Sequence, residues 1–252
     1  MAVVMLAGPK TSTWMVANAL RSVVPLRAVI VEQPVARWQL LRGRARRVGW
    51  PAVLGQMLFM LYARKLRFDS RQRAAQVRAT GGLDPERPSG VEIVDVRSAN
   101  DDRTRAILQQ LAPRVVVVCG TRILSRRLLE SVQATFINMH CGVTPKYRGV
   151  HGAYWALANG DTGNAGVTVH LVDAGIDTGG VLYQARIQPT ARDNFETYPL
   201  LQLAAGIPLL IRAVEDALAG RVTQVRTDLP SKLYYHPTLW QYCRTRIGAG
   251  VK

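Results

Sequence analysis

The stretch Arg114-Val-Val-Val-Val-Cys119 decides the fold class, because it places four consecutive valines between an arginine and a cysteine. β-Branched side chains favour extended backbone. An uninterrupted apolar run, without alternating polar residues, is typical of a parallel strand that is buried on both faces. Such a strand needs helices on both sides of its sheet, so the stretch predicts an α/β protein.

Apolar runs and helical patterns alternate on both sides of this stretch. Strand, helix and strand in succession imply right-handed parallel crossovers, so we expect a doubly wound, mostly parallel, Rossmann-like sheet within residues 1–220. Residues 221–252 form a short C-terminal extension that we expect to pack on this domain. Pro199 and Pro208 should break or bend the last helix. The expected strands are 2–7, 26–31, 91–96, 136–140, 167–172 and 181–187, and the expected helices are 11–23, 101–111, 125–132, 152–158 and 194–218.

A strongly basic segment, residues 37–80, interrupts the alternation after the second expected strand. The chain has a formal net charge of +16. Between residues 37 and 78 there are eleven Arg or Lys and one acid, Asp69, so this segment alone carries +10. Two interpretations stay open: a helical excursion whose apolar face packs on the domain, which we favour, or a helix that docks on an anionic membrane or nucleic acid. The apolar residues at helical spacing are Val53, Leu54, Met57, Leu58 and Leu61.

The cysteine count and the N-terminus bear on the compartment. The chain has three cysteines, an odd number without metal-ligand spacing, which suits a reducing cytoplasm. The first ten residues are apolar without a preceding basic region, which is typical of a buried strand and not of a signal peptide. We expect a cytoplasmic protein, either free or peripheral to the inner face of the membrane.

Asn138 and His140 are the first candidates for catalysis. They stand two apart in an expected strand, so their side chains leave it on the same side. An amide NH2 group stabilises a developing oxyanion, and an imidazole moves a proton near neutral pH. Asp173 and Asp177 flank a turn from which a carboxylate can orient that imidazole. Each feature also has a structural interpretation: a buried histidine satisfied by its neighbours, and an Asx-type turn between two strands.

The order of several motifs resembles the formyltransferase family, which includes glycinamide ribonucleotide, methionyl-tRNA and sugar N-formyltransferases. The resemblance runs from about residue 115 to residue 184 and is specific as a set. Residues 1–220 would then be the catalytic domain. The motifs are Gly120-Thr-Arg-Ile-Leu124, Asn138-Met-His140, Pro145-Lys-Tyr-Arg-Gly149, Val169-His170 and Asp173-Ala-Gly-Ile-Asp177-Thr-Gly179.

The resemblance implies a role for each candidate residue. Asn138 would polarise the formyl oxygen, His140 would transfer a proton as the acceptor amine attacks, and Asp177 would hold the imidazole or a water molecule. The formyl donor would be 10-formyltetrahydrofolate, and no metal would be needed. His170 would support the site, with a core histidine as an equal alternative. The donor would lie against Arg122, Ile123, Leu124, Asp173 and Gly175, and the acceptor against Lys146, Tyr147, Arg148 and His151.

Departures from the family pattern concern the acceptor. Cys141-Gly-Val-Thr-Pro145 stands where members often have Pro-Ser-Leu-Leu-Pro, and Gly8-Pro-Lys-Thr-Ser12 replaces the glycine-rich phosphate loop of the purine enzymes. The chain also ends before the separate C-terminal domain of a methionyl-tRNA enzyme. We therefore expect a small-molecule amine acceptor, a nucleotide-linked amino sugar of surface-glycan biosynthesis, and no specific nucleic acid.

Three alternatives stay open. A phosphoribosylglycinamide-type transferase or a 10-formyltetrahydrofolate hydrolase would use the same residues. A membrane- or nucleic-acid-binding protein on the same fold belongs to a different class. Cys141 as a nucleophile is disfavoured, because no activating neighbour is evident beyond His140. The aromatic tail could bury a homodimer interface as easily as a core, through Tyr234, Tyr235, Leu239 and Trp240.

Overall fold

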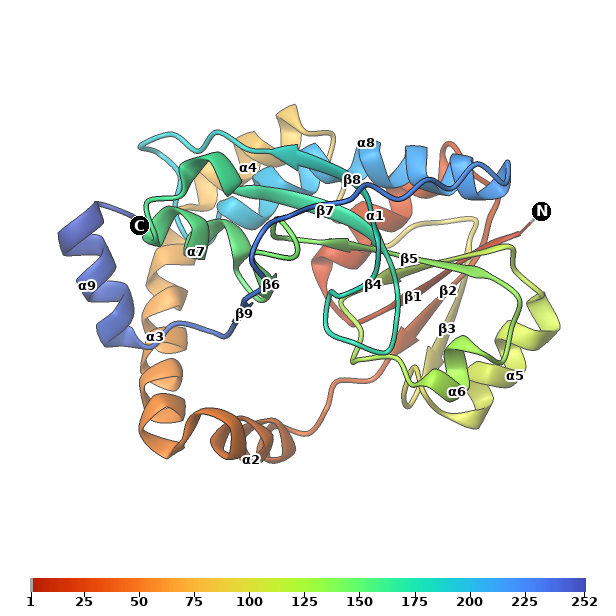
Figure 1. The fold of residues 1–252 in the computed structure, drawn as a ribbon, viewed down its shortest axis with the longest axis horizontal. Coiled ribbons are helices and arrows are strands. Elements are labelled where there is room, and N and C mark those ends of the chain that lie inside the picture. The colour runs from red at the N-terminus through yellow and green to blue at the C-terminus, as the bar shows by residue number, and fades with distance from the viewer. Residues whose placement is uncertain (1) are drawn as a thin grey trace.

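The computed structural model describes residues 2–252 and contains a seven-stranded sheet in the order β3-β2-β1-β4-β5-β7-β8 (Figure 1). β3, β2, β1, β4 and β5 pair in parallel, whereas β7 is antiparallel to β5 and β8. The mostly parallel sheet is thus confirmed, with the four-valine strand β4 in the middle. The strands are β1 (Val3–Ala7), β2 (Leu26–Glu32), β3 (Glu92–Val96), β4 (Val115–Cys119), β5 (Thr135–His140), β7 (Gly166–Leu171) and β8 (Val181–Arg186).

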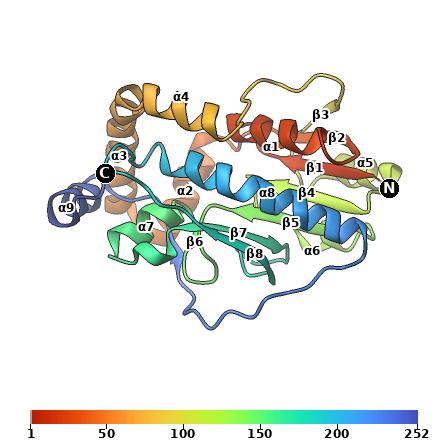
Figure 2. The ribbon, with the colours of Figure 1, turned by 90° about the horizontal axis from the view of Figure 1, so that it is seen from above.

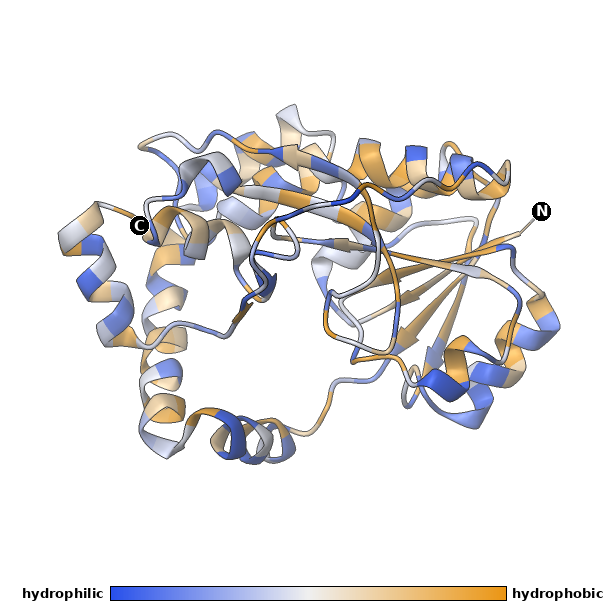
Figure 3. Cartoon of the chain, viewed as in Figure 1, coloured by the Kyte–Doolittle hydropathy of each residue, from blue (hydrophilic) through white to orange (hydrophobic). Residues whose placement is uncertain are grey.

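Helices cover both faces of the sheet, as a doubly wound fold requires. Figure 2 shows α1 and α8 side by side on one face. Met5 and Val117 pack in the cluster on that face, whereas Leu6 and Val116 pack in the cluster beneath α5 and α6. The apolar strands stand out in orange in Figure 3. These helices are α1 (Thr11–Arg21), α5 (Asp102–Leu111), α6 (Arg126–Leu129) and α8 (Tyr198–Leu218).

The two prolines of α8 do not break it, contrary to expectation. Pro199 lies in the first turn, where a backbone N–H has no partner within the helix. Pro208 lies inside the helix on its exposed side. Leu203, Ile207 and Leu210 on the opposite side are buried against the sheet. This packing holds the helix together across the missing hydrogen bond.

The basic segment forms three helices, α2 (Arg37–Val48), α3 (Trp50–Asp69) and α4 (Arg71–Thr80). One face of α3 packs on the domain, because Phe59, Ala63 and Leu66 are buried in a cluster that also holds Tyr154 and Tyr242. α2 contributes no buried residue. The packing interpretation is therefore correct for one face of α3 and does not describe α2. No helix within residues 2–252 is long and apolar enough to cross a membrane.

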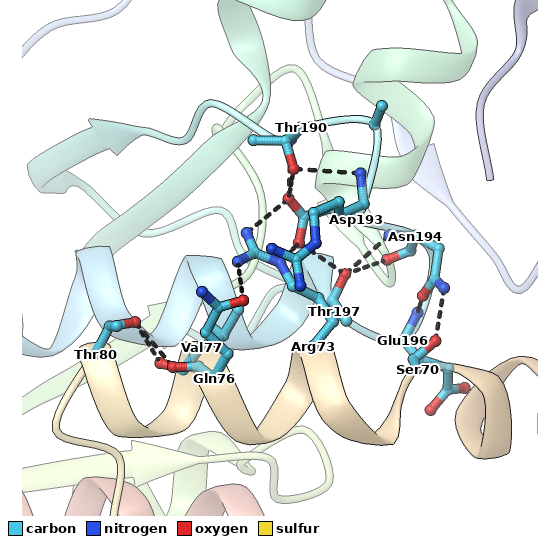
Figure 4. A network of polar contacts seen from close by, with 12 residues as sticks. Ser70, Arg73, Gln76, Val77, Thr80, Thr190, Asp193, Asn194, Glu196 and Thr197 are labelled. Carbon is cyan, nitrogen blue, oxygen red and sulfur yellow. Dashed lines mark hydrogen bonds and ion pairs between the residues drawn. The ribbon is translucent and has the colours of Figure 1, made fainter.

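A polar network ties α4 to the loop before α8 (Figure 4). Arg73 makes two hydrogen bonds of 2.8 and 2.9 Å to the carboxylate of Asp193, whose side chain is fully buried. Asp193 also accepts hydrogen bonds from Thr190 and Thr197. Asn194 donates to the hydroxyl of Ser70 at the junction of α3 and α4. The network fixes α4, and with it the end of α3, to the domain.

The C-terminal extension contacts the domain through a strand and a helix. Its strand β9 (Leu233–Tyr234) pairs in parallel with β6 (Arg148–Gly149), and α9 (Leu239–Ala249) packs on α3. Tyr242 is fully buried in the second cluster, while Trp240 is 51% exposed. The tail thus forms a core around Tyr242. The remaining elements are α7 (Gly152–Ala158) and the short helix η1 (Thr162–Asn164).

Candidate active site

A cavity of about 560 Å³ lies beyond the carboxyl ends of β1, β4 and β5. Open α/β sheets bind ligands at this edge, where the strand order reverses. Lys10 lines the cavity from the loop after β1, Cys119 from the end of β4, and His140 from the end of β5. The loop between β7 and β8 closes another side with Asp173 and Asp177. Residues from three strand ends and from the loop between β7 and β8 therefore share one cavity.

Asn138, His140, His170 and Asp177 meet in this cavity. The amide nitrogen of Asn138 lies 3.1 Å from Nε2 of His170 and 3.5 Å from Oδ1 of Asp177. The second carboxylate oxygen, Oδ2, lies 3.3 Å from Nδ1 of His140. The side chains of His140 and His170 are almost completely buried. One carboxylate thus connects an amide and two imidazoles.

The hydrogen bonds of His140 define its protonation. Nε2 lies 2.8 Å from the carbonyl oxygen of Tyr147, which only accepts hydrogen bonds, so Nε2 carries the hydrogen. In the neutral ring, Nδ1 is then unprotonated and faces Asp177. Burial lowers the pKa of His140 below its ordinary value, against the opposing charge of Asp177. His140 is therefore a neutral base at pH 7, and a proton taken up at Nδ1 meets a carboxylate already in place.

Asp177 is held in a conformation that few residues adopt. Its φ of 51° lies in the left-handed region, which Asp tolerates better than most side chains. Oδ2 accepts a hydrogen bond of 3.0 Å from the backbone N–H of Gly149, and Arg148 donates to the carbonyl of Ile176. Burial opposes the charged form, but hydrogen bonds from His170 and Gly149 and the electrostatic interaction with His140 lower the pKa of Asp177 to about 2. Asp177 is therefore ionised at neutral pH.

The residues expected on the donor side all line the cavity. Arg122 is fixed by an ion pair of 2.6 Å with the buried Glu32, and its backbone N–H donates to the same carboxylate. Leu124 is buried and Ile123 is 48% exposed. Asp173 accepts hydrogen bonds from the N–H of Gly175 and the hydroxyl of Thr178, which shapes the loop. This side combines an apolar wall with polar loop edges.

The residues expected on the acceptor side are divided. His151 lines the cavity, with a left-handed φ of 58°. Arg148 acts beside it by holding the loop of Asp177. Lys146 instead pairs with Asp161 at 2.6 Å, and the hydroxyl of Tyr147 donates to the same carboxylate. Neither side chain lines the cavity, because both contact Asp161, and the carbonyl of Tyr147 accepts the hydrogen bond of His140.

His236 belongs to the cavity although its sequence context gave no signal. It comes from the C-terminal extension, and its Nδ1 lies 3.0 Å from Nε2 of His151. Burial lowers the pKa of His236 to about 4, and burial together with His236 lowers that of His151 well below its usual value. All four histidines of the chain therefore line one cavity. The number of histidines in the sequence does not predict this clustering, which becomes visible only in the fold.

The cysteines of the cavity are unreactive. Burial raises the pKa of Cys119 to about 11 and that of Cys141 to about 12, so both stay protonated thiols at neutral pH. A protonated thiol is a weak nucleophile. Within residues 2–252, no group of three or more His, Cys, Asp or Glu side chains has an arrangement that could hold a metal ion.

A family model described as Formyl transferase matches residues 62–214. The chain therefore belongs to the formyl transferase family, and the resemblance seen in the motifs is confirmed. It is similar to methionyl-tRNA formyltransferase of Thermodesulfovibrio yellowstonii, at 33% identity over 135 residues, 53% of this chain and 44% of the relative. The enzyme of that name from Anaeromyxobacter dehalogenans is 30% identical over 196 residues, 70% and 61% of the two chains. The chain thus spans about half the length of such relatives.

Solved structures share the fold over nearly the whole chain. A glycinamide ribonucleotide transformylase from Symbiobacterium toebii has a TM-score of 0.59 at 20% identity, over 93% of this chain and 94% of the other. A sugar N-formyltransferase from a Shewanella species has a TM-score of 0.55 at 16% identity, over 93% and 76%. Helix α2 lies outside the residues that the family model matches.

Proposed function

We propose that the chain transfers a formyl group from 10-formyltetrahydrofolate to a primary amine, and that the amine belongs to a nucleotide-linked amino sugar. One observation carries the reaction: an ionised carboxylate, Asp177, contacts a buried neutral imidazole, His140, and an amide, Asn138, in one cavity. A base and a hydrogen-bond donor on either side of one carboxylate suit attack of an amine on an acyl carbon.

Each residue has a separate task. Nδ1 of His140 takes the proton that the amine loses as its nitrogen bonds to the formyl carbon. Asp177 and the carbonyl of Tyr147 then stabilise the imidazolium from its two sides. The amide nitrogen of Asn138 exchanges its long 3.5 Å contact with Asp177 for a hydrogen bond to the formyl oxygen, which gains negative charge. The proton leaves His140 for the nitrogen that the formyl group vacates.

The cavity suits a folate as the donor. Ile123, Leu124 and Val172 provide apolar surface for a flat ring system, and Asp173 and the backbone of the adjacent loops provide polar edges. The donor supplies a formyl group already activated on nitrogen. The protein then has only to bind, orient and move protons, which matches the residues present.

The acceptor proposal depends on the loop after β5 and on the shape of the fold. Cys141-Gly-Val-Thr-Pro145 reaches the cavity through Cys141, and its sequence departs from the Pro-Ser-Leu-Leu-Pro that members of the family often have. The chain also shares its fold with a sugar N-formyltransferase, and this likeness in fold is compatible with an amino-sugar acceptor.

The test is to incubate the purified chain with 10-formyltetrahydrofolate and a panel of nucleotide-linked amino sugars. We expect one acceptor to gain a formyl group by mass spectrometry, and His140→Gln and Asn138→Ala to abolish the gain while circular dichroism stays unchanged. Full activity of both variants would contradict the proposal. Release of formate at the full turnover rate without any amine would instead identify a hydrolase.

A further inference from the structure

A second cavity, of about 380 Å³, adjoins the catalytic one. The two share Gly149, Val150, Ile176 and His236 in their walls. The outer wall is one face of α2, which stands apart from the sheet in Figure 1. The residues of that face recur at helical spacing, namely Gln39, Leu40, Gly43, Arg44, Arg47 and Val48.

This second cavity carries unbalanced positive charge. Arg44 and Arg47 line it, and its lining contains no Asp or Glu. Arg44 is partly buried, and neither arginine has a side-chain hydrogen bond or an ion pair within residues 2–252. Because part of its charge is removed from water, burial lowers the pKa of Arg44. A guanidinium in such a place is stabilised by a bound anion.

A buried amide in the same wall also lacks a partner. Gln56 is only 4% exposed and donates from Nε2 to the carbonyl of His236, at 2.9 Å. Its Oε1 has no hydrogen-bond partner among the described residues. A buried oxygen left unpaired costs free energy. The cavity thus offers two cations for an anion, and the amide of Gln56 holds the backbone of His236 in its wall.

We propose that this cavity is the acceptor subsite, in which Arg44 and Arg47 bind the phosphoryl groups of the acceptor. The inference rests on the proposed function and names its substrate class: a phosphorylated amine. The shared wall lets one molecule place its phosphates at α2 and its amine at His140. α2 lies outside residues 62–214, which the family model matches.

The test measures binding without the donor, using UDP, inorganic pyrophosphate and a polyprenyl monophosphate in detergent micelles as probes. Arg44→Gln/Arg47→Gln should weaken binding of at least one probe about tenfold or more, since each lost charge-assisted hydrogen bond costs roughly that factor. The matched control, Arg42→Gln/Arg46→Gln, removes the same charge from residues of α2 that do not line the cavity and should leave binding unchanged. Binding of UDP identifies a nucleotide acceptor, and binding of the micellar probe alone identifies a lipid-linked one.

Two outcomes overturn the subsite: no probe binds the wild-type chain, or both double variants lose the same affinity. His140→Gln should lose formyl transfer but keep probe binding, which separates this inference from the catalytic proposal. Once an acceptor is identified, Arg44→Gln should raise the KM for that acceptor about tenfold, while kcat and the KM for the donor change little. A fall in kcat alone would contradict a binding role.

A separate observation concerns the exposed side of α3. Nine of the sixteen large apolar side chains exposed within residues 2–252 lie between residues 38 and 68. On α3, the most exposed are Trp50, Leu54, Leu61 and Phe68, at 57–65% exposure. Monomeric proteins rarely expose so many apolar side chains in one place. α3 is thus apolar on two faces, and only one of them is covered.

The positive charge around the exposed apolar face of α3 indicates which kind of partner binds there. Arg64 and Lys65 lie on α3 among the exposed apolar residues, and neither forms an ion pair within residues 2–252. Residues 37–78 carry +10. Two copies of such a face would repel each other, whereas anionic lipid headgroups supply the opposite charge. We infer that α3 docks in the headgroup region of an anionic membrane, with its tryptophan and leucines inserted.

Co-sedimentation with phosphatidylcholine vesicles, with and without phosphatidylglycerol, tests this docking. We expect binding to the anionic vesicles at low salt, weaker binding at high salt, and loss of binding in Leu54→Glu/Leu61→Glu. The matched control, Val23→Glu/Val222→Glu, alters exposed side chains elsewhere and should bind as the wild type does. No binding to anionic vesicles at low salt overturns the inference, as does a dimer in light scattering that Leu54→Glu/Leu61→Glu dissociates.

Discussion

The catalytic edge of the sheet and the basic excursion differ in whether their functional side chains have partners within the protein. At the edge, His140 and His170 are buried and Asp177 is mostly buried, and each contacts another group of the protein. In the excursion, Arg44 lies beside a cavity without a partner, and α3 leaves one apolar face uncovered. The edge is complete in itself and prepared for chemistry, whereas the excursion is complete only when something binds to it.

Breaking the catalytic edge should produce the largest effect. His140→Gln removes the base that takes the proton of the amine, and general-base catalysis contributes about 10²- to 10⁴-fold. We expect kcat to fall by that factor in steady-state formyl transfer, with a small change in the KM for the acceptor. Arg42→Gln, on the exposed side of α2, serves as the control and should keep the wild-type kcat. An equal fall in both would remove the distinction between the two regions.

The anchor between the regions should produce the next largest effect. Arg73→Ala leaves the fully buried carboxylate of Asp193 without its cation (Figure 4), and breaking a buried pair in this way costs about 3–5 kcal/mol. Arg67→Ala breaks the neighbouring pair with Glu196, in which the arginine is 74% exposed, and should cost less than about 1 kcal/mol. Urea unfolding measures both. Similar losses would show that the network of Asp193 does not anchor the excursion.

Acid should weaken the contact between the extension and the cavity. The pKa of His236 is lowered to about 4 in the folded chain, below the ordinary value of 6.5. The unfolded chain therefore binds the proton first, and stability is lost as the pH falls from about 6.5 towards 4. We expect His236→Asn to reduce the loss over that range by on the order of 1–2 kcal/mol. Chemical unfolding at pH 7 and pH 4.5 measures this loss of stability in both proteins. An equal loss in the wild type and in His236→Asn would contradict the lowered pKa of His236.

The sequence predicts the catalytic edge better than the excursion, for a physical reason. Four valines in β4 and the spacing of Asn138 and His140 are local patterns, and strand geometry converts them directly into positions. The second cavity depends on pairing between Arg148–Gly149 and Leu233–Tyr234, more than eighty residues apart, which brings His236 beside α2. Nothing local encodes that pairing. The side chains of Lys146 and Tyr147, predicted at the acceptor, contact Asp161 instead of lining the cavity. No local pattern around Lys146 and Tyr147 indicates that contact either.

The smallest expected effect is on stability, and it comes from replacing one glycine in α2 and one glycine in α3. A Cβ atom at Gly43 of α2 would meet no atom within 4 Å, so Gly43→Ala should stabilise that helix by about 0.5–1 kcal/mol. A Cβ atom at Gly55 of α3 would overlap the ring of Trp240, so Gly55→Ala should displace α9 and cancel the same gain. Amide hydrogen exchange should slow within residues 37–48 in the first variant and accelerate within 239–249 in the second. Faster exchange of α2 after Gly43→Ala would mean that its helix already packs on something the glycine accommodates, and α2 would then no longer stand free over the second cavity.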